Sequence, residues 1–303
     1  MGEGQSIQWF PGHMTKTKRQ MEKTLKLVDA VAEIVDARIP ISSRNPVIDQ
    51  IIQQKPRVIL LNKADMADPA QTKRWIAFYR SKGILAMPID CKSGKGIQNF
   101  IPLVKELLKD RIASWESKGM VCRTIRVMVV GVPNVGKSSL INRMSKQSKA
   151  NVEDRPGVTR ENRWFTIGKG FELLDTPGIL WPKFEDQSVG LNLAYTGAVK
   201  DEILDVETLG CHLMAYLGAN YPEALKTGYK LPALPEREDG EEDVAWGYRL
   251  LEAAGKKRGF LISGGEVDTE RMAKILLDEY RAGKLGRFTL EMPEETEQPA
   301  ASE

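Results

Sequence analysis

The chain has 303 residues, of which 42% are hydrophobic and 28% are charged, and its formal net charge is +3. This length and composition are typical of a globular protein of about two domains, and so small a net charge does not by itself indicate a nucleic-acid-binding protein. No apolar run approaches the ~18 residues of a membrane-spanning helix, so we expect no membrane partner. The three cysteines lack metal-ligand spacing, which favours a reducing, cytoplasmic location over a disulfide framework or a zinc site.

The first part of the chain alternates short apolar runs with patterns of helical period. Strands are expected at residues 30–36, 57–61, 84–89, 125–130, 164–167 and 171–174. Helices are expected at residues 45–54, 69–82 and 97–115, and a further helix is expected to begin near residue 138. Strands that alternate with helices predict an α/β domain with a mostly parallel sheet and helices on both faces.

The character of the sequence changes near residue 185, where the β-branched runs stop. Long helical patterns follow at residues 188–204, 206–217, 243–254 and 269–282. We therefore expect an α/β domain over residues 1–184, a small all-helical domain over residues 185–290, and a tail over residues 291–303. The tail is rich in glutamate and proline, a composition that favours disorder.

A glycine-rich loop directly follows the strand expected at residues 125–130. Gly131 to Ser138 (GVPNVGKS) has the spacing of a P-loop. In such a loop, backbone N–H groups bind phosphate, Lys137 reaches the β- and γ-phosphates, and the hydroxyl of Ser138 binds Mg²⁺. The alternative is a plain glycine turn, which the strand and helix on either side disfavour. Nucleotide contacts are expected from Asn134, Val135, Gly136, Lys137, Ser138 and Ser139.

A second motif selects the base. Asn62-Lys63-Ala-Asp65 follows the strand expected at residues 57–61. The carboxylate of Asp65 can accept hydrogen bonds from N1–H and the 2-amino group of guanine, which adenine does not offer. Asn62 can contact the base and brace the P-loop, and the alkyl stem of Lys63 can cover the base. The two motifs together predict binding of GTP and GDP.

Three further positions fit a GTPase. Asp175 to Gly178 (DTPG) follow the last expected strand, where Asp175 would hold Mg²⁺ through water and the N–H of Gly178 would contact the γ-phosphate. Thr159 precedes this strand and would bind Mg²⁺ only when the γ-phosphate is present. Cys91 and Lys92 stand where GTPases usually carry Ala-Lys in a loop that contacts guanine through backbone N–H, a contact that the small Cys91 should allow. A plain turn is the alternative for this loop.

The order of the motifs is unusual. Ordinary GTPases begin with the P-loop, whereas here Asn62 to Asp65 and the Cys91 loop precede Gly131. This rotated order, together with Trp9-Phe-Pro-Gly-His13-Met and Asp36-Ala-Arg-Ile-Pro40, resembles the circularly permuted GTPases, and in particular the ribosome biogenesis GTPase A family of bacteria. The resemblance extends over nearly the whole chain.

This resemblance implies a partner and a role. It implies a GTPase that binds the precursor of the large ribosomal subunit and its rRNA and promotes late maturation. Hydrolysis would be stimulated by the particle and would drive release. We expect a monomer. A signalling or membrane-associated G protein is the alternative, but the sequence offers no credible anchor; an RNA-dependent ATPase is a second one, which Asp65 disfavours.

The catalytic group is not supplied in the usual place. Ile179 occupies the position where many GTPases carry a glutamine that orients water, and its side chain cannot do this. The resemblance implies that His13 supplies the function, with Lys137 and Thr159 completing the catalytic set. Packing within its loop, or contact with RNA, is the alternative for His13.

Two further predictions concern a K⁺ site at Asn134 and RNA binding by basic residues. GTPases with asparagine at this place in the P-loop are often activated by K⁺, which the side-chain oxygen helps to hold; simple bracing of the loop by Asn134 is the alternative. Basic residues could neutralise RNA phosphates, although a solvated helix face is the more frequent explanation for any single one. They are Lys16, Lys18, Arg19, Lys23, Lys26, Arg249, Lys256, Lys257, Arg258, Arg271, Lys274, Arg281, Lys284 and Arg287.

Overall fold

The protein is described from a computed structural model, which covers residue 19 and residues 21–52, 55–120, 123–148, 152–153, 163–178, 186–199 and 205–293. The chain divides into two compact units. We call residues 1–185 with residues 289–303 the sheet unit, and residues 186–288 the helical unit. The border after residue 185 lies one residue from the expected one, whereas the return of the chain to the sheet unit at residue 289 was not expected.

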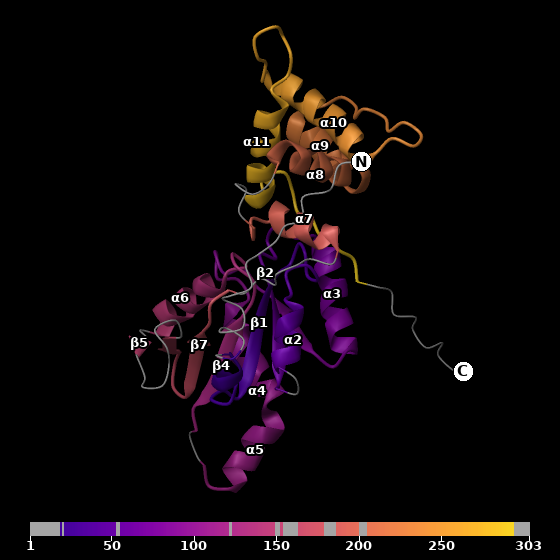
Figure 1. Cartoon of the computed structure of the whole chain (residues 1–303). Helices are drawn as coiled ribbons and strands as arrows, with labels where there is room; N and C mark the ends of the chain where they lie inside the picture. Colours follow the sequence, from indigo (N-terminus) through magenta and orange to yellow (C-terminus); the bar gives the residue numbers. More distant parts are fainter. Residues whose placement is uncertain are drawn as a thin grey trace, which may run out of the picture. The chain divides into compact units, whose positions relative to one another are not determined.

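A seven-stranded sheet forms the core of the described part of the sheet unit, in the order β3-β2-β1-β4-β7-β6-β5 (Figure 1). Its strands are β1 (Ala30–Asp36), β2 (Arg57–Asn62), β3 (Leu85–Pro88), β4 (Ile125–Val130), β5 (Val152–Glu153), β6 (Arg163–Thr166) and β7 (Phe171–Asp175). The strands β3, β2, β1, β4 and β7 are parallel to one another, whereas β6 pairs antiparallel with β7 and β5 pairs antiparallel with β6. The predicted mostly parallel sheet is therefore confirmed.

The central position of β4 places the candidate site. This strand pairs with β1 on one side and with β7 on the other. The carboxyl ends of parallel strands share one edge of a sheet, and ligands of α/β proteins bind outside that edge. Asp36, Asn62, Gly131 and Asp175 stand at or just beyond the ends of β1, β2, β4 and β7. Residues far apart in the sequence are thus brought to one edge.

Helices cover both faces of the sheet. They are α2 (Pro46–Ile52), α3 (Pro69–Ser81), α4 (Phe100–Leu107) and α6 (Lys137–Ser148), while α5 (Lys109–Ser117) follows α4 and buries no residue. On one face, the isoleucines of α2 pack with Leu174 of β7, and Trp75 and Tyr79 of α3 pack on β1 and β2. Side chains alternate along a strand, so Phe171 points to the opposite face from Leu174. There the rings of Phe171 and Phe100 of α4 lie 6.0 Å apart between centroids.

The helix expected at residues 97–115 is interrupted. A 3₁₀ turn (Ile97–Asn99) leads into α4, and Leu108 then leaves helical geometry with φ −100° and ψ 9°. Leu108 is fully buried, whereas α5 after it buries no residue. The pattern predicts one long helix because periodicity alone does not show that helix packing against the core ends at a buried leucine.

The expected tail is corrected at its beginning. Leu290 donates its N–H to the carbonyl of Arg38 at 2.7 Å, and the indole of Trp75 donates to the carbonyl of Glu291 at 2.9 Å. Residues 289–293 therefore belong to the sheet unit. Composition suggested disorder from residue 291, but these hydrogen bonds are made to residues more than 200 positions away, which composition cannot reveal. Residues 294–303 lie outside the described part of the chain.

The helical unit contains α7 (Gln187–Tyr195), α8 (Val206–Asn220), α9 (Pro222–Tyr229), α10 (Asp243–Arg258) and α11 (Thr269–Arg281). Glycines let three of them approach closely. A Cβ on Gly247 of α10 would lie 2.0 Å from the carbonyl oxygen of Cys211 in α8, and one on Gly210 would lie 2.5 Å from Cβ of Ala273 in α11. The helix expected at residues 188–204 already ends at Tyr195, and α9 was not expected. No described helix is both long and apolar enough to span a membrane.

Candidate functional site

The loop after β4 needs its glycines. A Cβ on Gly131 would lie 2.5 Å from the carbonyl oxygen of Ile34 in β1. Gly136 has φ 108°, and a Cβ there would lie 2.2 Å from Nδ2 of Asn62. Asn134 also has a positive φ, 61°. Backbone of this kind turns successive N–H groups toward one point, which makes an anion-binding concavity at the N-terminus of α6.

Lys137 lies inside this loop. Its ammonium donates to the carbonyls of Gly131 at 3.0 Å and Val132 at 2.9 Å. Burial lowers the pKa of Lys137 to about 8, although the nearby carboxylate of Asp175 opposes the shift. An ammonium has three N–H donors, and an anionic ligand stabilises the charged form of a buried lysine. The geometry therefore fits a lysine that binds phosphate.

Asn62 links two loops. Its Nδ2 donates to the carbonyl of Val135 in the P-loop at 2.6 Å, and its Oδ1 accepts from the N–H of Cys91 at 3.0 Å. The side chain is 3% exposed. One amide thus joins the end of β2 to the phosphate-binding loop and to the loop after β3. The bracing expected of Asn62 is present, while its contact with guanine stays a prediction.

The loop that contains Cys91 and Lys92 is closed by its own hydrogen bonds. The carboxylate of Asp90 accepts from the N–H of Lys92 at 2.8 Å and of Ser93 at 3.2 Å. Arg143 of α6 donates to the carbonyl of Lys92. Burial raises the pKa of the Cys91 thiol to about 12, so the thiol stays neutral. The two N–H groups expected to contact guanine bond to Asn62 and Asp90, so a guanine contact there requires one of these bonds to be shared or exchanged.

Lys63 and Asp65 have different surroundings, although they are only two positions apart. Lys63 has φ 59°, a conformation that few residues other than glycine adopt. Its ammonium lies 2.9 Å from Oδ2 of Asp36, a carboxylate that is 1% exposed. Asp65 is exposed, and no described residue bonds to its carboxylate. Asp65 is thus available to a ligand, whereas Lys63 is held.

The cluster around Asp36 was not assigned a role from the sequence. Arg38 donates to Asp36 from its backbone N–H at 3.0 Å, from Nε at 2.9 Å and from a terminal nitrogen at 2.8 Å. Arg38 and Lys63 hold the pKa of the Asp36 carboxyl well below its usual range, against the effect of burial. An acidic residue at the end of a buried strand, two positions before an arginine, is the signal that could have drawn attention to it.

Three described residues could hold Mg²⁺ and the γ-phosphate. Asp175 ends β7 beside Val129 of the P-loop strand, and burial raises the pKa of its carboxyl. Ser138 is exposed in the first turn of α6. A Cβ on Gly178 would lie 2.8 Å from Nζ of Lys137, so this glycine lies against the phosphate-binding lysine. Mg²⁺ is usually held by one or two protein oxygens together with phosphates, which this set fits.

Two residues predicted to act in catalysis belong to parts of the chain that the structure does not describe. His13 and Thr159, together with Ile179, lie outside the described residues. The described site therefore contains the base-binding and phosphate-binding motifs but not the group expected to orient water.

Comparison with known proteins decides the family. Residues 126–214 match a family model described as 50S ribosome-binding GTPase. The chain is 50% identical over 289 residues to ribosome biogenesis GTPase A of Bacillus cereus, covering 95% of each chain. The chain belongs to the ribosome biogenesis GTPase A family. It is accordingly a GTPase that takes part in ribosome biogenesis, and GTP and GDP are its nucleotides.

Solved structures agree with this membership of the ribosome biogenesis GTPase A family. A GDP-bound YlqF is 27% identical, with a TM-score of 0.62, and the match covers 91% of this chain and 100% of that one. A GNP-bound YlqF from T. maritima is also 27% identical, with a TM-score of 0.60, and covers 93% of this chain and 100% of that one. The rotated motif order and the circularly permuted fold are therefore features that the chain shares with these proteins.

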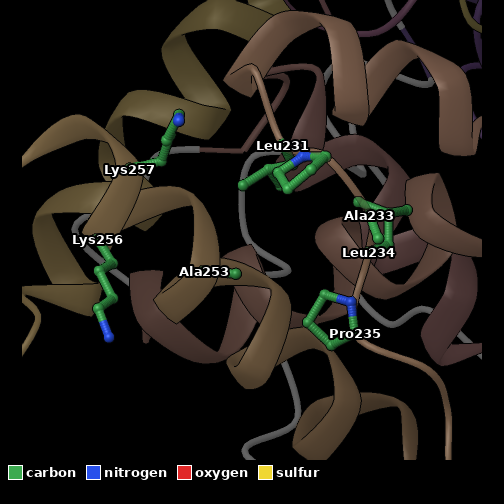
Figure 2. Close-up of a pocket in the computed structure, with 8 residues that line it drawn as sticks. Leu231, Ala233, Leu234, Pro235, Ala253, Lys256 and Lys257 are labelled. Carbon is green, nitrogen blue, oxygen red and sulfur yellow. The ribbon is translucent and has the colours of Figure 1, made fainter.

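The described basic residues expected to bind RNA differ in whether they already form ion pairs, while Lys16 and Lys18 lie outside the described residues. Some are already engaged: Arg249 pairs with Glu241, Arg258 with Glu279, and Lys274 with Glu270. Lys256 and Lys257 are exposed, and neither forms an ion pair with a described residue. Both line an open pocket of about 510 Å³ opposite the apolar segment from Leu231 to Pro235 (Figure 2).

Proposed function

We propose that this GTPase binds the precursor of the large ribosomal subunit and promotes its late maturation, and that the particle stimulates GTP hydrolysis, which drives release. Support comes from the family model, whose description names the 50S subunit. The observation that carries the nucleotide part is Asn62, which joins the P-loop to the Cys91 loop and so prepares a guanine site. A ribosomal partner also implies the compartment in which ribosomes are assembled, for which we propose the cytoplasm.

Nucleotide binding is assigned to two sets of residues. Asp65 accepts from guanine, with Asn62, Lys63, Cys91 and Lys92 around the base. Val135, Gly136, Lys137, Ser138 and Ser139 surround the phosphates, and Gly178 senses the γ-phosphate. Ser138, Asp175 and Thr159 would hold Mg²⁺, which would supply positive charge beside the phosphates.

Hydrolysis is attack of water on the γ-phosphorus of GTP, in which positioning and charge stabilisation supply most of the acceleration. Lys137 stabilises the transferred phosphoryl group from within the P-loop. His13 orients or deprotonates the water once the particle has brought it near the γ-phosphate. Asn134 would contribute its side-chain oxygen to a K⁺ ion beside the phosphates, for which turnover in KCl and in NaCl is the test. Equal turnover in the two salts would exclude a K⁺ site.

The helical unit is assigned to RNA. Lys256 and Lys257 are the clearest candidates, because their ammonium groups are exposed and free of ion pairs with described residues. Residues in exposed pairs, such as Lys274 with Glu270, can exchange their partner for a phosphate at little cost. Binding through such contacts weakens steeply with salt. Binding to the particle that does not change with salt would contradict this assignment.

Co-sedimentation with ribosomal particles tests the proposal. The full chain, expected to be a monomer, is mixed with large-subunit precursors, mature large subunits or small subunits, in GTP, GDP or no nucleotide. We expect it to pellet with the large-subunit precursor in GTP and to be released in GDP. A signalling or membrane-associated G protein would pellet with none of the particles in any nucleotide state.

A further inference from the structure

The segment that follows the helical unit is bonded to the sheet unit by its backbone. Leu290 donates to the carbonyl of Arg38 at 2.7 Å. The backbone N–H of Asp68 donates to the hydroxyl of Thr289 at 3.1 Å, and the indole of Trp75 donates to the carbonyl of Glu291 at 2.9 Å. We call residues 289–292 the strap. None of its contacts is needed for the chemistry of nucleotide binding described above.

The side chain of Glu291 holds a loop. Its carboxylate accepts from the N–H of Ile41 at 2.5 Å and from the N–H of Ser42 at 3.0 Å, and the hydroxyl of Ser42 also donates to it. Hydrogen bonds to an ionised acceptor are roughly twice as strong as neutral ones. The strap therefore binds residues 38–42 through hydrogen bonds from its backbone and to a charged side chain.

The loop that the strap holds begins at Asp36. The N–H of Asp36 donates to the hydroxyl of Ser43 at 2.9 Å, which closes the loop over residues 36–43. The Asp36 carboxylate is bonded to Arg38 and lies 2.9 Å from the ammonium of Lys63. The strap thus reaches Asp36 in two ways: Leu290 bonds to Arg38, which bonds to Asp36, and Glu291 bonds to Ser42, whose neighbour Ser43 bonds to the N–H of Asp36. Asp36 in turn pairs with Lys63, a residue of the guanine motif.

We propose that the strap positions Lys63 through the loop of residues 36–43, so that affinity for guanine nucleotides depends on whether the strap is docked. Glu291 is a positioning residue in this scheme, because it acts through Asp36 and Lys63 and does not touch the nucleotide. The inference rests on the proposed role of Asn62 to Asp65 in guanine binding. It adds a coupling that this role does not require.

The strap gives the helical unit a covalent route to the nucleotide site. Phe288 is the last residue of that unit, and Thr289 begins the strap. A partner that restrains the helical unit can therefore favour or oppose docking of the strap. Coupling of two binding events is reciprocal, so guanine nucleotide must stabilise the docked strap by the same factor by which the docked strap tightens nucleotide binding.

Binding of a fluorescent GDP to the full chain tests the proposal. The variants are Glu291→Ala, the milder Glu291→Gln, Lys63→Ala and the double variant Lys63→Ala/Glu291→Ala. Glu270→Ala is the matched control, since Glu270 is an exposed glutamate whose ion pair with Lys274 lies within one helix. We expect Glu291→Ala to bind GDP roughly fivefold more weakly and Glu270→Ala to match the wild type. In the double variant, Glu291→Ala should add nothing to the effect of Lys63→Ala.

Hydrogen exchange supplies a second readout. GDP should slow exchange of the N–H groups of Leu290, Ile41 and Ser42 in the wild type, and not in Lys63→Ala. Wild-type affinity in Glu291→Ala and Glu291→Gln, or an effect that adds fully to that of Lys63→Ala, would overturn the coupling while leaving the guanine site in place. If Lys63→Ala binds GDP like the wild type, the proposed role of Lys63 in guanine binding is wrong. The coupling, which acts through Lys63, is then wrong as well.

Discussion

The two halves of the nucleotide site are built differently. In the base half, Asn62 bonds to both neighbouring loops, and Lys63 is held by the buried carboxylate of Asp36. In the phosphate half, Ser138 is exposed, and Lys137 bonds only to carbonyls of its own loop among the described residues. His13 and Thr159, which we expect to complete this half, are assigned from the sequence alone.

This difference suggests how the protein divides its tasks. Hydrogen bonds within the base half hold the loops of the proposed guanine site in place before nucleotide arrives, which limits the entropy lost on binding. In the phosphate half, the buried ammonium of Lys137 can bind phosphate, and the partly buried carboxylate of Asp175 can bind a cation. In the function proposed above, base recognition is thus a property of the fold, whereas hydrolysis depends on His13, which the particle would bring to the γ-phosphate.

The largest expected effect concerns the base half. Replacing Asp65 by asparagine exchanges an acceptor for a donor opposite the guanine 2-amino group, and xanthine offers an oxygen there. We expect the preference for GDP over xanthosine diphosphate to change by about 1000-fold, as measured by competition binding. Asp68→Asn is the control, because Asp68 caps α3 and asparagine caps helices equally well. An unchanged base preference in Asp65→Asn would remove Asp65 from the site.

The next effect concerns the phosphate half. His13→Ala should lower particle-stimulated turnover by about 100-fold, the usual contribution of a general acid or base. Affinity for GTP should stay unchanged, because His13 acts only in the transition state. The control is His212→Ala, which alters the other histidine, in α8. Wild-type turnover in His13→Ala would assign hydrolysis to another group.

Gly136→Ala should disturb both halves at once. A Cβ at this position meets the side-chain nitrogen of Asn62 at 2.2 Å, so either the P-loop or Asn62 must move. We expect a cost of about 2 kcal/mol, which corresponds to about 30-fold weaker GDP binding by calorimetry. Gly168→Ala is the control, since Gly168 also has a positive φ, 74°, but no atom within 4 Å of the added Cβ. Equal losses in the two variants would mean that only backbone strain matters.

The smallest effect is a pH dependence of the phosphate half. Burial lowers the pKa of Lys137 to about 8 in the free protein, and phosphate must raise it again in the complex. Binding therefore takes up a proton above pH 8, and GDP affinity should be about tenfold weaker at pH 9 than at pH 7. The same depressed pKa makes the free fold more stable as pH rises above 8, because the unfolded chain then binds more protons.

Calorimetry in two buffers of different ionisation enthalpy measures this uptake directly. Lys137→Arg is the reference, because its guanidinium stays charged over the whole range. Equal proton uptake in the wild type and in Lys137→Arg would show that Lys137 is not its source.

Much of the site could be predicted from the sequence, because its motifs are local. Gly131 to Ser138 and Asn62 to Asp65 each place their residues by strand ends and loop geometry, and the parallel sheet brings them together. The grip of Glu291 on Ser42 could not be predicted, since it joins residues 249 positions apart. The break at Leu108 and the engaged N–H groups of Cys91 and Lys92 depend on packing, which periodicity and motif spacing do not contain.

GTP turnover in the presence of purified ribosomal particles tests the central claim most directly. We measure the rate of phosphate release by the full chain alone, with large-subunit particles and with small subunits. We expect slow turnover alone, strong stimulation by large-subunit particles and none by small subunits. Turnover that is the same under all three conditions would contradict a hydrolytic half completed on the large subunit.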